Sequence, residues 1–260
     1  MRFLVLDFET YYADDFTLSK MTAEEYVRDP RFEIIGVSFG WLGEQPQWYS
    51  GDLDYIKSVL HQLPWHDIFV VGHNMSAFDS LILTEVCGVR PAAYGCTLQL
   101  ARCLNGSKTP DGKSISNGLG ALARMYGLPM DKGDEVIHAK NKRRLDFTPH
   151  ELAAYGHYCD KDVLLCGMLW QKLSPQFPKS ELFLASTVTK MWAEPRLVLD
   201  EPLLKAMGIE MAERKAEILG KVADMLGVGT TMTIDERMYH TQKLLRSDAK
   251  FAELLTRYDV

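Results

Sequence analysis

The sequence lacks the marks of a secreted or membrane-bound protein. Its five cysteines form no Cys-x-x-Cys pair, and no apolar stretch approaches the roughly 20 residues that a membrane-spanning helix needs. The first apolar run, Phe3 to Leu6, is broken by Asp7 and Glu9, so we expect no signal peptide. These absences predict reduced thiols, a cytoplasmic location and no membrane partner.

The sequence also lacks a large excess of charge of one sign. A formal net charge of -6 over 260 residues excludes a basic surface that extends over the whole chain. Any contact with nucleic acid is therefore expected to be local, on a short single-stranded end and not along a long duplex. Internal repeats and low-complexity tracts are absent as well. The hydrophobic content of 47% suffices for one large domain, or for one domain with an appendage.

The first third of the chain predicts strands with short connections, followed by alternating helices and strands. Apolar and β-branched residues favour strands over 2–7, 33–41 and 45–49, with a turn at Gly43. Helical spacing in "GDLDYIKSVLHQL" precedes a short buried strand, "DIFVVGHN", and then a helix that Gly88 closes. This order predicts an α/β fold with an antiparallel edge.

A long helix is predicted to begin at Thr148. There "TPHE" combines a threonine N-cap, a proline at the first helical position and a glutamate that completes a capping box. The helix should run to about Lys172, and Pro195 marks the next boundary. We therefore expect a domain over 1–197 that carries the chemistry. A charged helical extension over 198–260 should follow it.

Four acidic residues stand where packing explains an acid poorly. Asp7 and Glu9 lie two residues apart at the end of an apolar strand, so their side chains should point to the same side. Asp79 lies between a buried strand and an apolar helix, and Asp162 comes just before an apolar run. Each of these two has an ordinary explanation, as a helix cap or as a solvated helix residue. Four acids from three segments nevertheless favour a shared role.

A group of four carboxylates suits hard cations. Oxygen ligands are those that Mg2+ and Mn2+ prefer, and two such ions about 4 Å apart stabilise both the attacking and the leaving oxygen of a phosphodiester displacement. The set therefore predicts hydrolysis of a nucleic-acid backbone. Tyr158 stands four residues before Asp162, so on a helix the two side chains lie within about 40° of each other. Tyr158 can then reach a water bound beside Asp162.

Three short motifs resemble those of a known superfamily. The residues "LDFET", "GHNMSAFD" and "YCDKD" are similar to the three exonuclease motifs of the DEDD superfamily. The spacing Tyr-x-x-x-Asp resembles its tyrosine subclass, found in the proofreading domains of family A DNA polymerases. The resemblance implies a ribonuclease H-like fold, with a mixed sheet flanked by helices. It also implies 3'-to-5' exonuclease activity that releases nucleoside 5'-monophosphates.

The resemblance extends over nearly the whole chain. "LSKMTAEEYVRDPRFEIIGVSFGW" and "MWAEPRLVLDEPLLKA" are similar to the N-terminal part of bacteriophage-type family A polymerases, and "LLRSDAKFAELLTRYDV" is similar to the start of the thumb. No segment resembles a palm or fingers, so we expect no polymerisation chemistry. The chain would be an excised fragment or a standalone nuclease, in the host cytoplasm if it is viral.

The resemblance also implies roles and partners. Asp7, Glu9 and Asp162 would hold the ion that delivers hydroxide, and Asp7 with Asp79 would serve a second Mg2+ or Mn2+. Tyr158 would orient the attacking water. The expected substrate is a single-stranded DNA 3' end or a frayed primer terminus. A polymerase domain in the same chain and other replisome proteins are the expected partners of a monomer.

A histidine competes with the tyrosine for this assignment. His157 stands five residues before Asp162, which matches the spacing of the histidine subclass. If the helix begins at Thr148, however, residue 157 lies well inside it and points roughly 140° away from Asp162. The helix geometry therefore favours Tyr158.

Four residues are weaker candidates for contacts with DNA. Thr10 directly follows the first motif and is a candidate neighbour of the terminal nucleotide. Asn74 stands five residues before Asp79, whereas relatives of the superfamily usually have an asparagine four residues before it. Arg143 lies in the basic stretch "AKNKRR", which would contact phosphates, and Lys132 in "MDKGDEV" is a similar candidate.

Two other functions stay open at this point. A non-catalytic module that binds nucleic acid or replisome proteins would keep the same fold, although four intact acids argue against lost activity. An RNA exonuclease of the histidine subclass is the second alternative. Metal-dependent hydrolysis tests the first, and the preference for DNA or RNA tests the second.

Overall fold

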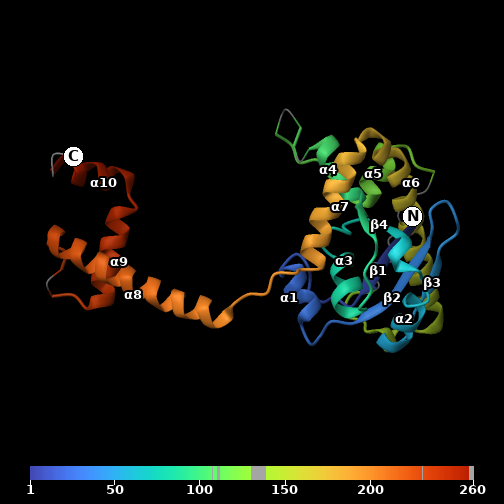
Figure 1. Ribbon diagram of the computed structural model, residues 1–260, viewed down its shortest axis with the longest axis horizontal. Coiled ribbons are helices and arrows are strands. Elements are labelled where there is room, and N and C mark those ends of the chain that lie inside the picture. The colour runs from blue at the N-terminus through green and yellow to red at the C-terminus, as the bar shows by residue number, and fades with distance from the viewer. Residues whose placement is uncertain (107, 110–111, 130–138, 230, 258–260) are drawn as a thin grey trace. The chain divides into compact units, whose positions relative to one another are not determined.

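The protein forms two compact units, Met1–Arg196 and Leu197–Val260 (Figure 1). The computed structural model describes residues 1–106, 108–109, 112–129, 139–229 and 231–257. The first unit contains a five-stranded sheet with helices on both faces, and the second consists of helices. Over these described ranges, no helix combines the length and the apolar character needed to cross a membrane.

The sheet has the strand order β3-β2-β1-β4-β5. Its strands are β1 (Arg2–Thr10), β2 (Ile34–Trp41), β3 (Gln47–Tyr49), β4 (Ile68–Gly72) and β5 (Ala93–Cys96). β2 is antiparallel to both β1 and β3, whereas β4 is parallel to β1 and to β5. This order and these directions are those of a ribonuclease H-like sheet. The α/β class with a mixed sheet is therefore confirmed.

Two sets of helices cover the two faces of this sheet. One face is covered by α1 (Ala23–Arg28), α2 (Leu53–Leu60), α3 (Asp79–Leu81) and α7 (Lys179–Ala193). The other is covered by α4 (Thr97–Asn105), α5 (Leu119–Met125) and α6 (Pro149–Leu173). Short 3-10 turns lie at Trp65–Asp67, Arg144–Asp146 and Ser174–Gln176.

Alternation along β1 separates two hydrophobic cores. Leu6 and Phe8 point into the core beneath α1, α2 and α3, whereas Val5 packs with the residues of α6. Because successive side chains of a strand point to opposite faces, Asp7 and Glu9 share the α6 face with Val5. That face therefore changes, within one strand, from an apolar residue to two carboxylates.

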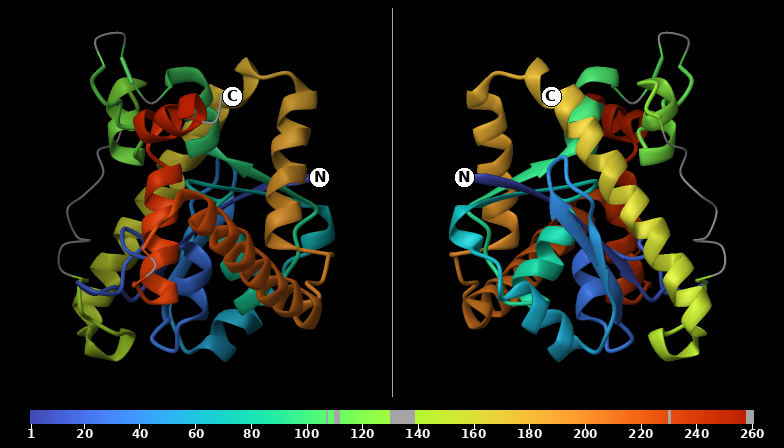
Figure 2. Two further views of the ribbon diagram at one scale, coloured as in Figure 1. Left: turned by 90° about the vertical axis from the view of Figure 1, so that its left-hand side faces the viewer. Right: turned by 90° about the vertical axis from the view of Figure 1, so that its right-hand side faces the viewer.

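The helix α6 crosses the sheet and is the long yellow helix in the right-hand view of Figure 2. It begins as predicted, because the Thr148 hydroxyl accepts from the backbone of Glu151 and the Glu151 carboxylate accepts from the backbone of Thr148. Gly156 lets the helix approach β3, since a Cβ there would lie 2.5 Å from the Trp48 indole. This close approach brings the helix near enough to β1 for its side chains to reach the carboxylates.

Three local predictions differ from the structure. β1 does not end at Asp7 as predicted, because its pairing with β2 continues through Glu9 to Thr10. The helix expected after Asp79 is one α-helical turn followed by a π-helix, Ile82–Val86, although Gly88 closes it with φ 71° as expected. The strand β5 was not predicted, because four residues give too short a periodic signal.

The second unit contains α8 (Glu201–Leu226), α9 (Ile234–Leu245) and α10 (Asp248–Arg257). α8 ends at Gly227, whose φ of 64° is the left-handed conformation that glycine adopts without strain. α9 begins with a capping box formed by Thr233 and Glu236. An ion pair between Arg237 and Asp224 and the buried side chain of Leu219 hold α8 and α9 together.

Candidate active site

Asp7 and Glu9 lie where β1 extends beyond its pairing with β4. On one side, Asp7 pairs with Ser38 and Glu9 with Gly36 of β2. On the other, the pairing with β4 stops at Val5. The rest of this edge of β1 is therefore available to the segment that follows β4.

Asp79 occupies that edge. Its carboxylate accepts a hydrogen bond from the backbone N–H of Phe8 and another from its own N–H, so the first turn of α3 lies against β1. The side chain is almost completely buried, with 2% of the residue exposed. Burial disfavours the charged form and raises the pKa of Asp79 to about 7, against the opposing effect of the two backbone hydrogen bonds. A buried carboxylate with such a pKa would gain most from a bound cation.

α6 presents one face to these carboxylates. Tyr155, Tyr158, Cys159 and Asp162 have the spacing i, i+3, i+4 and i+7, which is one stripe of a helix. The Tyr158 hydroxyl is hydrogen-bonded to the Asp162 carboxylate. The pKa of Tyr158 is raised, first by burial and then by the charges of Asp162, Glu9 and Asp7. The hydroxyl is therefore bonded to Asp162, and the charges of Glu9 and Asp7 also act on it.

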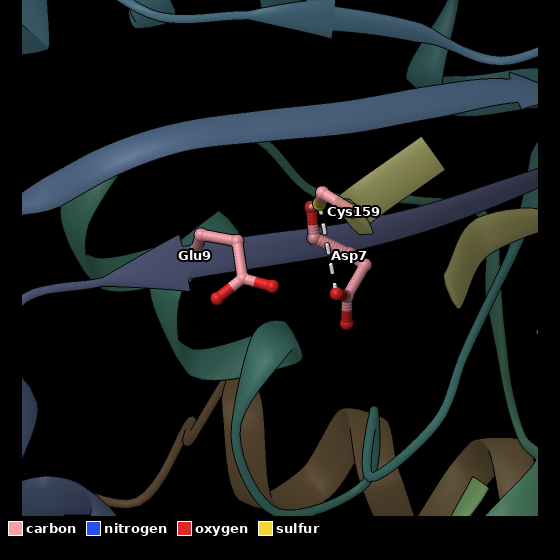
Figure 3. Close-up of side chains that lie close together, drawn as sticks. All are labelled: Asp7, Glu9 and Cys159. Atoms are coloured by element: carbon pink, nitrogen blue, oxygen red, sulfur yellow. Dashed lines mark hydrogen bonds between the residues drawn. The ribbon is translucent and has the colours of Figure 1, made fainter. Parts of the chain in front are cut away.

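Cys159 lies between the strand and the helix. Its Sγ is 3.6 Å from the carbonyl oxygen and 3.7 Å from Oδ2 of Asp7, and the Asp7 and Glu9 carboxylates point to one side of β1 (Figure 3). Ligand atoms of Asp7, Glu9 and Cys159 lie within 4.8 Å of one another. Burial, followed by the charges of Asp7 and Glu9, raises the pKa of the thiol well above its ordinary value. The sulfur therefore stays protonated and donates to Asp7, which leaves carboxylate oxygens as the ligand atoms.

A second buried thiol, that of Cys166, is affected by the charges of both Asp7 and Asp79. Burial raises the pKa of Cys166 well above its ordinary value, and the charges of Asp7 and Asp79 add to the shift. The charges of both carboxylates therefore act on this one thiol. Over the described residues, the group whose ligand atoms lie within 4.8 Å of one another contains Asp7, Glu9 and Cys159, and it does not include Asp79 or Asp162. Its carboxylate oxygens are donors of the kind that hard divalent cations prefer.

Tyr155 is a site residue that the sequence reasoning missed. Its hydroxyl donates to Oε2 of Glu9 at 2.5 Å, and its ring stacks on Phe147 with centroids 5.5 Å apart. Burial is the first cause that raises its pKa, and the Glu9 charge is the second. The available signal was its spacing, three residues before Tyr158 and seven before Asp162.

His157 lies on another face of α6. Its side chain is exposed, and its charge acts to lower the pKa of Asp160, which burial raises. Asp160 in turn accepts from the buried Ser38 hydroxyl at 2.5 Å. The structure therefore brings Tyr158 to the carboxylates and leaves His157 away from them.

Asn74 shows how the extra residue in the second motif is accommodated. It adopts the left-handed conformation with φ 76°, and its carbonyl oxygen accepts from the N–H groups of Ala77 and Phe78. This turn absorbs one residue and still delivers Asp79 to the start of α3. Asn74 also lines a surface hollow of about 280 Å³ together with Gln99 and Arg102 of α4.

Of the other three candidate contacts with DNA, the two that the structure describes, Thr10 and Arg143, both have partners within the protein. The Thr10 hydroxyl is hydrogen-bonded to Tyr26 at 2.9 Å. Arg143 pairs with Glu33 at 2.7 Å and lies over the ring of Tyr11, so its guanidinium joins two loops of the unit. Lys132 lies outside the described residues.

The chain matches no protein-family model and no curated protein. Two solved structures of NrnC from Brucella melitensis are similar to it, and one of them is bound to pGG. The bound structure has 16% sequence identity and a TM-score of 0.48, and the other has 15% and 0.47; each similarity covers 77% of this chain and 91% of NrnC. The polymerase part of the sequence resemblance has no counterpart in these two similarities. Residue roles therefore rest on the geometry of the site itself.

Proposed function

We propose that this chain is a metal-dependent 3'-to-5' exonuclease of the DEDD type that cleaves single-stranded nucleic acid. The observation that carries the proposal is the close grouping of Asp7 and Glu9 beside α6. Asp162 of α6 is hydrogen-bonded to Tyr158, and Asp79 is buried against the same strand. Packing alone gives no reason to place four acids from three segments together. Their mutual repulsion would be relieved by bound cations.

The carboxylates would hold two divalent ions, Mg2+ or Mn2+. Asp7, Glu9 and Asp162 would ligate one, and Asp7 with Asp79 would serve the other. Such ions supply a nucleophilic hydroxide and neutralise the charge that develops on the leaving 3' oxygen. Because Asp79 is buried, its ligand oxygen would be oriented before the substrate arrives.

Tyr158 would orient the attacking water and would not act as a base. Burial and three neighbouring carboxylates raise its pKa, so the hydroxyl keeps its proton at neutral pH. A protonated phenol can donate one hydrogen bond and accept another. Tyr155 would hold Glu9 through its own hydroxyl and so fix one ligand oxygen.

DNA is the proposed substrate, and proofreading beside a polymerase is the proposed setting. Both narrower assignments rest on the sequence resemblance. The hollow lined by Asn74, Gln99 and Arg102 supports a path for the strand next to the second motif, because it offers two amides and a guanidinium. An RNA exonuclease of the histidine subclass is disfavoured by the exposed position of His157.

The test is degradation of a 5'-labelled single-stranded oligodeoxynucleotide in the presence of Mg2+ or of a chelator. We expect a ladder that shortens from the 3' end, requires Mg2+ and disappears in Asp162→Ala. A matched oligoribonucleotide measures the preference for DNA. Tight binding without cleavage in Mg2+ and in Mn2+ would instead support the non-catalytic module.

A further inference from the structure

The second unit carries a basic hollow near the end of α9. The hollow has a volume of about 340 Å³, and its lining includes Tyr239, Gln242, Lys243 and Arg246. Tyr239, Lys243 and Arg246 follow the spacing i, i+4 and i+7, so they share one face of the helix region. None of the residues that line the hollow is acidic.

Two cations converge on one amide inside this cluster. With the Gln242 amide in the orientation that satisfies its neighbours, its oxygen accepts from the Arg246 guanidinium at 3.1 Å and from the Lys215 ammonium at 3.2 Å. Lys215 comes from α8, so two helices contribute positive charge to one place. Holding like charges this close is unfavourable unless an anion compensates them.

The acids of this unit do not compensate the cluster. Over its described residues, Lys215, Lys243 and Arg246 form no ion pair, whereas Arg237 pairs with Asp224 and Lys221 with Glu217. The sequence between Glu236 and Asp248 contains basic residues but no acid. The cluster is therefore a local positive site in a chain of net charge -6.

We propose that this hollow binds the phosphate backbone of single-stranded nucleic acid and that Tyr239 stacks on one of its bases. Three cationic side chains would contact phosphates, and Gln242 would donate through its amide nitrogen. Tyr239 is 61% exposed and offers the flat aromatic face that bases of any sequence stack on. This aromatic face favours nucleic acid over an acidic protein segment. The inference rests on the proposed function in one respect: the nucleic acid that binds in the hollow is taken to be a substrate of the proposed exonuclease.

Binding of a fluorescein-labelled oligothymidylate to the full chain, followed by fluorescence anisotropy in EDTA, tests the proposal. The double variant Lys243→Gln/Arg246→Gln should bind about tenfold more weakly at low salt. Its slope of log affinity against log salt should be smaller by about 1.4, because roughly 0.7 is lost per phosphate contact. Tyr239→Leu should weaken binding about fivefold or more and leave the slope unchanged.

The control is Arg214→Gln/Lys250→Gln, which removes the same charge from exposed positions outside the hollow. If the Lys243/Arg246 variant binds within about twofold of this control, the proposal is overturned. It is equally overturned if the variant loses only the binding of a polyglutamate peptide. EDTA blocks metal-dependent hydrolysis, so this binding result stands whether or not the carboxylate site cleaves DNA. A cleavage assay on the same samples judges the proposed function separately.

Discussion

The two faces of β1 differ in what their side chains do, although they alternate along one strand. Leu6 and Phe8 fill a core that is closed by helices, and they contribute apolar area removed from water. Asp7 and Glu9 point to the other face. There the Tyr155 hydroxyl of α6 donates to Glu9 and the Cys159 thiol donates to Asp7, while the charges of both carboxylates act on Tyr158. One face therefore contributes stability, whereas the other places like charges together at a cost in stability. Such a cost is typical of functional sites.

Substituting neighbours on the two faces gives the largest contrast. Asp7→Asn keeps the shape of the side chain but removes a ligand charge, and we expect hydrolysis to fall by about a thousandfold, the equivalent of roughly 4 kcal/mol. Leu6→Ala empties a fully buried position and should lower the free energy of unfolding by about 2–5 kcal/mol. Its hydrolysis per folded molecule should stay within about threefold of wild type.

Oligonucleotide cleavage and urea unfolding, both measured on the two variants, check this contrast. Asp7→Asn should unfold at the same or a higher urea concentration than wild type in EDTA, because it relieves repulsion. If Asp7→Asn were as destabilised as Leu6→Ala, or still cleaved DNA at the wild-type rate, the division between the two faces would be wrong.

The pH dependence of stability sharpens the same contrast at Asp79. The pKa of this residue is about 7 in the folded protein and near its ordinary 3.8 in the unfolded chain. Between these values the folded state binds more protons, so the free energy of unfolding in EDTA should fall as pH rises from about 4 to about 7. The slope from this one group is at most about 1.4 kcal/mol per pH unit.

Asp79→Asn should remove the contribution of this residue to the fall in the free energy of unfolding between about pH 4 and about pH 7. The difference between the wild-type and variant curves isolates the group, because the other carboxylates contribute to both. Mg2+ should stabilise the wild type most at the high end of the range, where the ionised ligand is available. If the curves of unfolding free energy against pH were parallel for the wild type and the variant in EDTA, the raised pKa of Asp79 would be refuted.

Tyr158 and His157 provide a matched pair on adjacent positions of α6. Tyr158→Phe removes the hydroxyl that is hydrogen-bonded to Asp162, and we expect cleavage to fall by about a hundredfold. His157→Ala changes an exposed side chain and should leave the rate within about twofold. Single-turnover cleavage at saturating Mg2+ is the measurement. The opposite result would assign the chain to the histidine subclass.

Much of this site was predictable from the sequence because its signals are local. The capping box at Thr148 fixed where α6 begins, and that start alone separated Tyr158 from His157 by helical rotation. The alternation around Asp7 and Glu9 predicted that both acids share a face, although not that β1 continues beyond Asp7 to Thr10. Spacing within one element was sufficient for each of these conclusions.

The parts that were missed depend on contacts between distant segments. The hydrogen bond from Tyr155 to Glu9 joins residues 146 positions apart. The spacing of Tyr155 places it on the face of α6 that carries Tyr158, but it does not identify Glu9 as its partner. The partners of Arg143 within the protein, Glu33 and the ring of Tyr11, were not predicted, because only the folded loops bring them near. The left-handed turn at Asn74 likewise depends on hydrogen bonds within a loop whose register the motif did not reveal.

Tyr155 supports the smallest predicted effect. Tyr155→Phe retains the ring that stacks on Phe147 and removes the hydroxyl that donates to Glu9, so the fold should persist while one ligand becomes less well oriented. Loss of a partner that orients a ligand typically weakens metal binding by 10- to 100-fold. We therefore expect the Mg2+ concentration for half-maximal cleavage to rise about tenfold, with a much smaller change in rate at saturating Mg2+. A reduced saturating rate with unchanged Mg2+ dependence would show that Tyr155 acts on the substrate and not through Glu9.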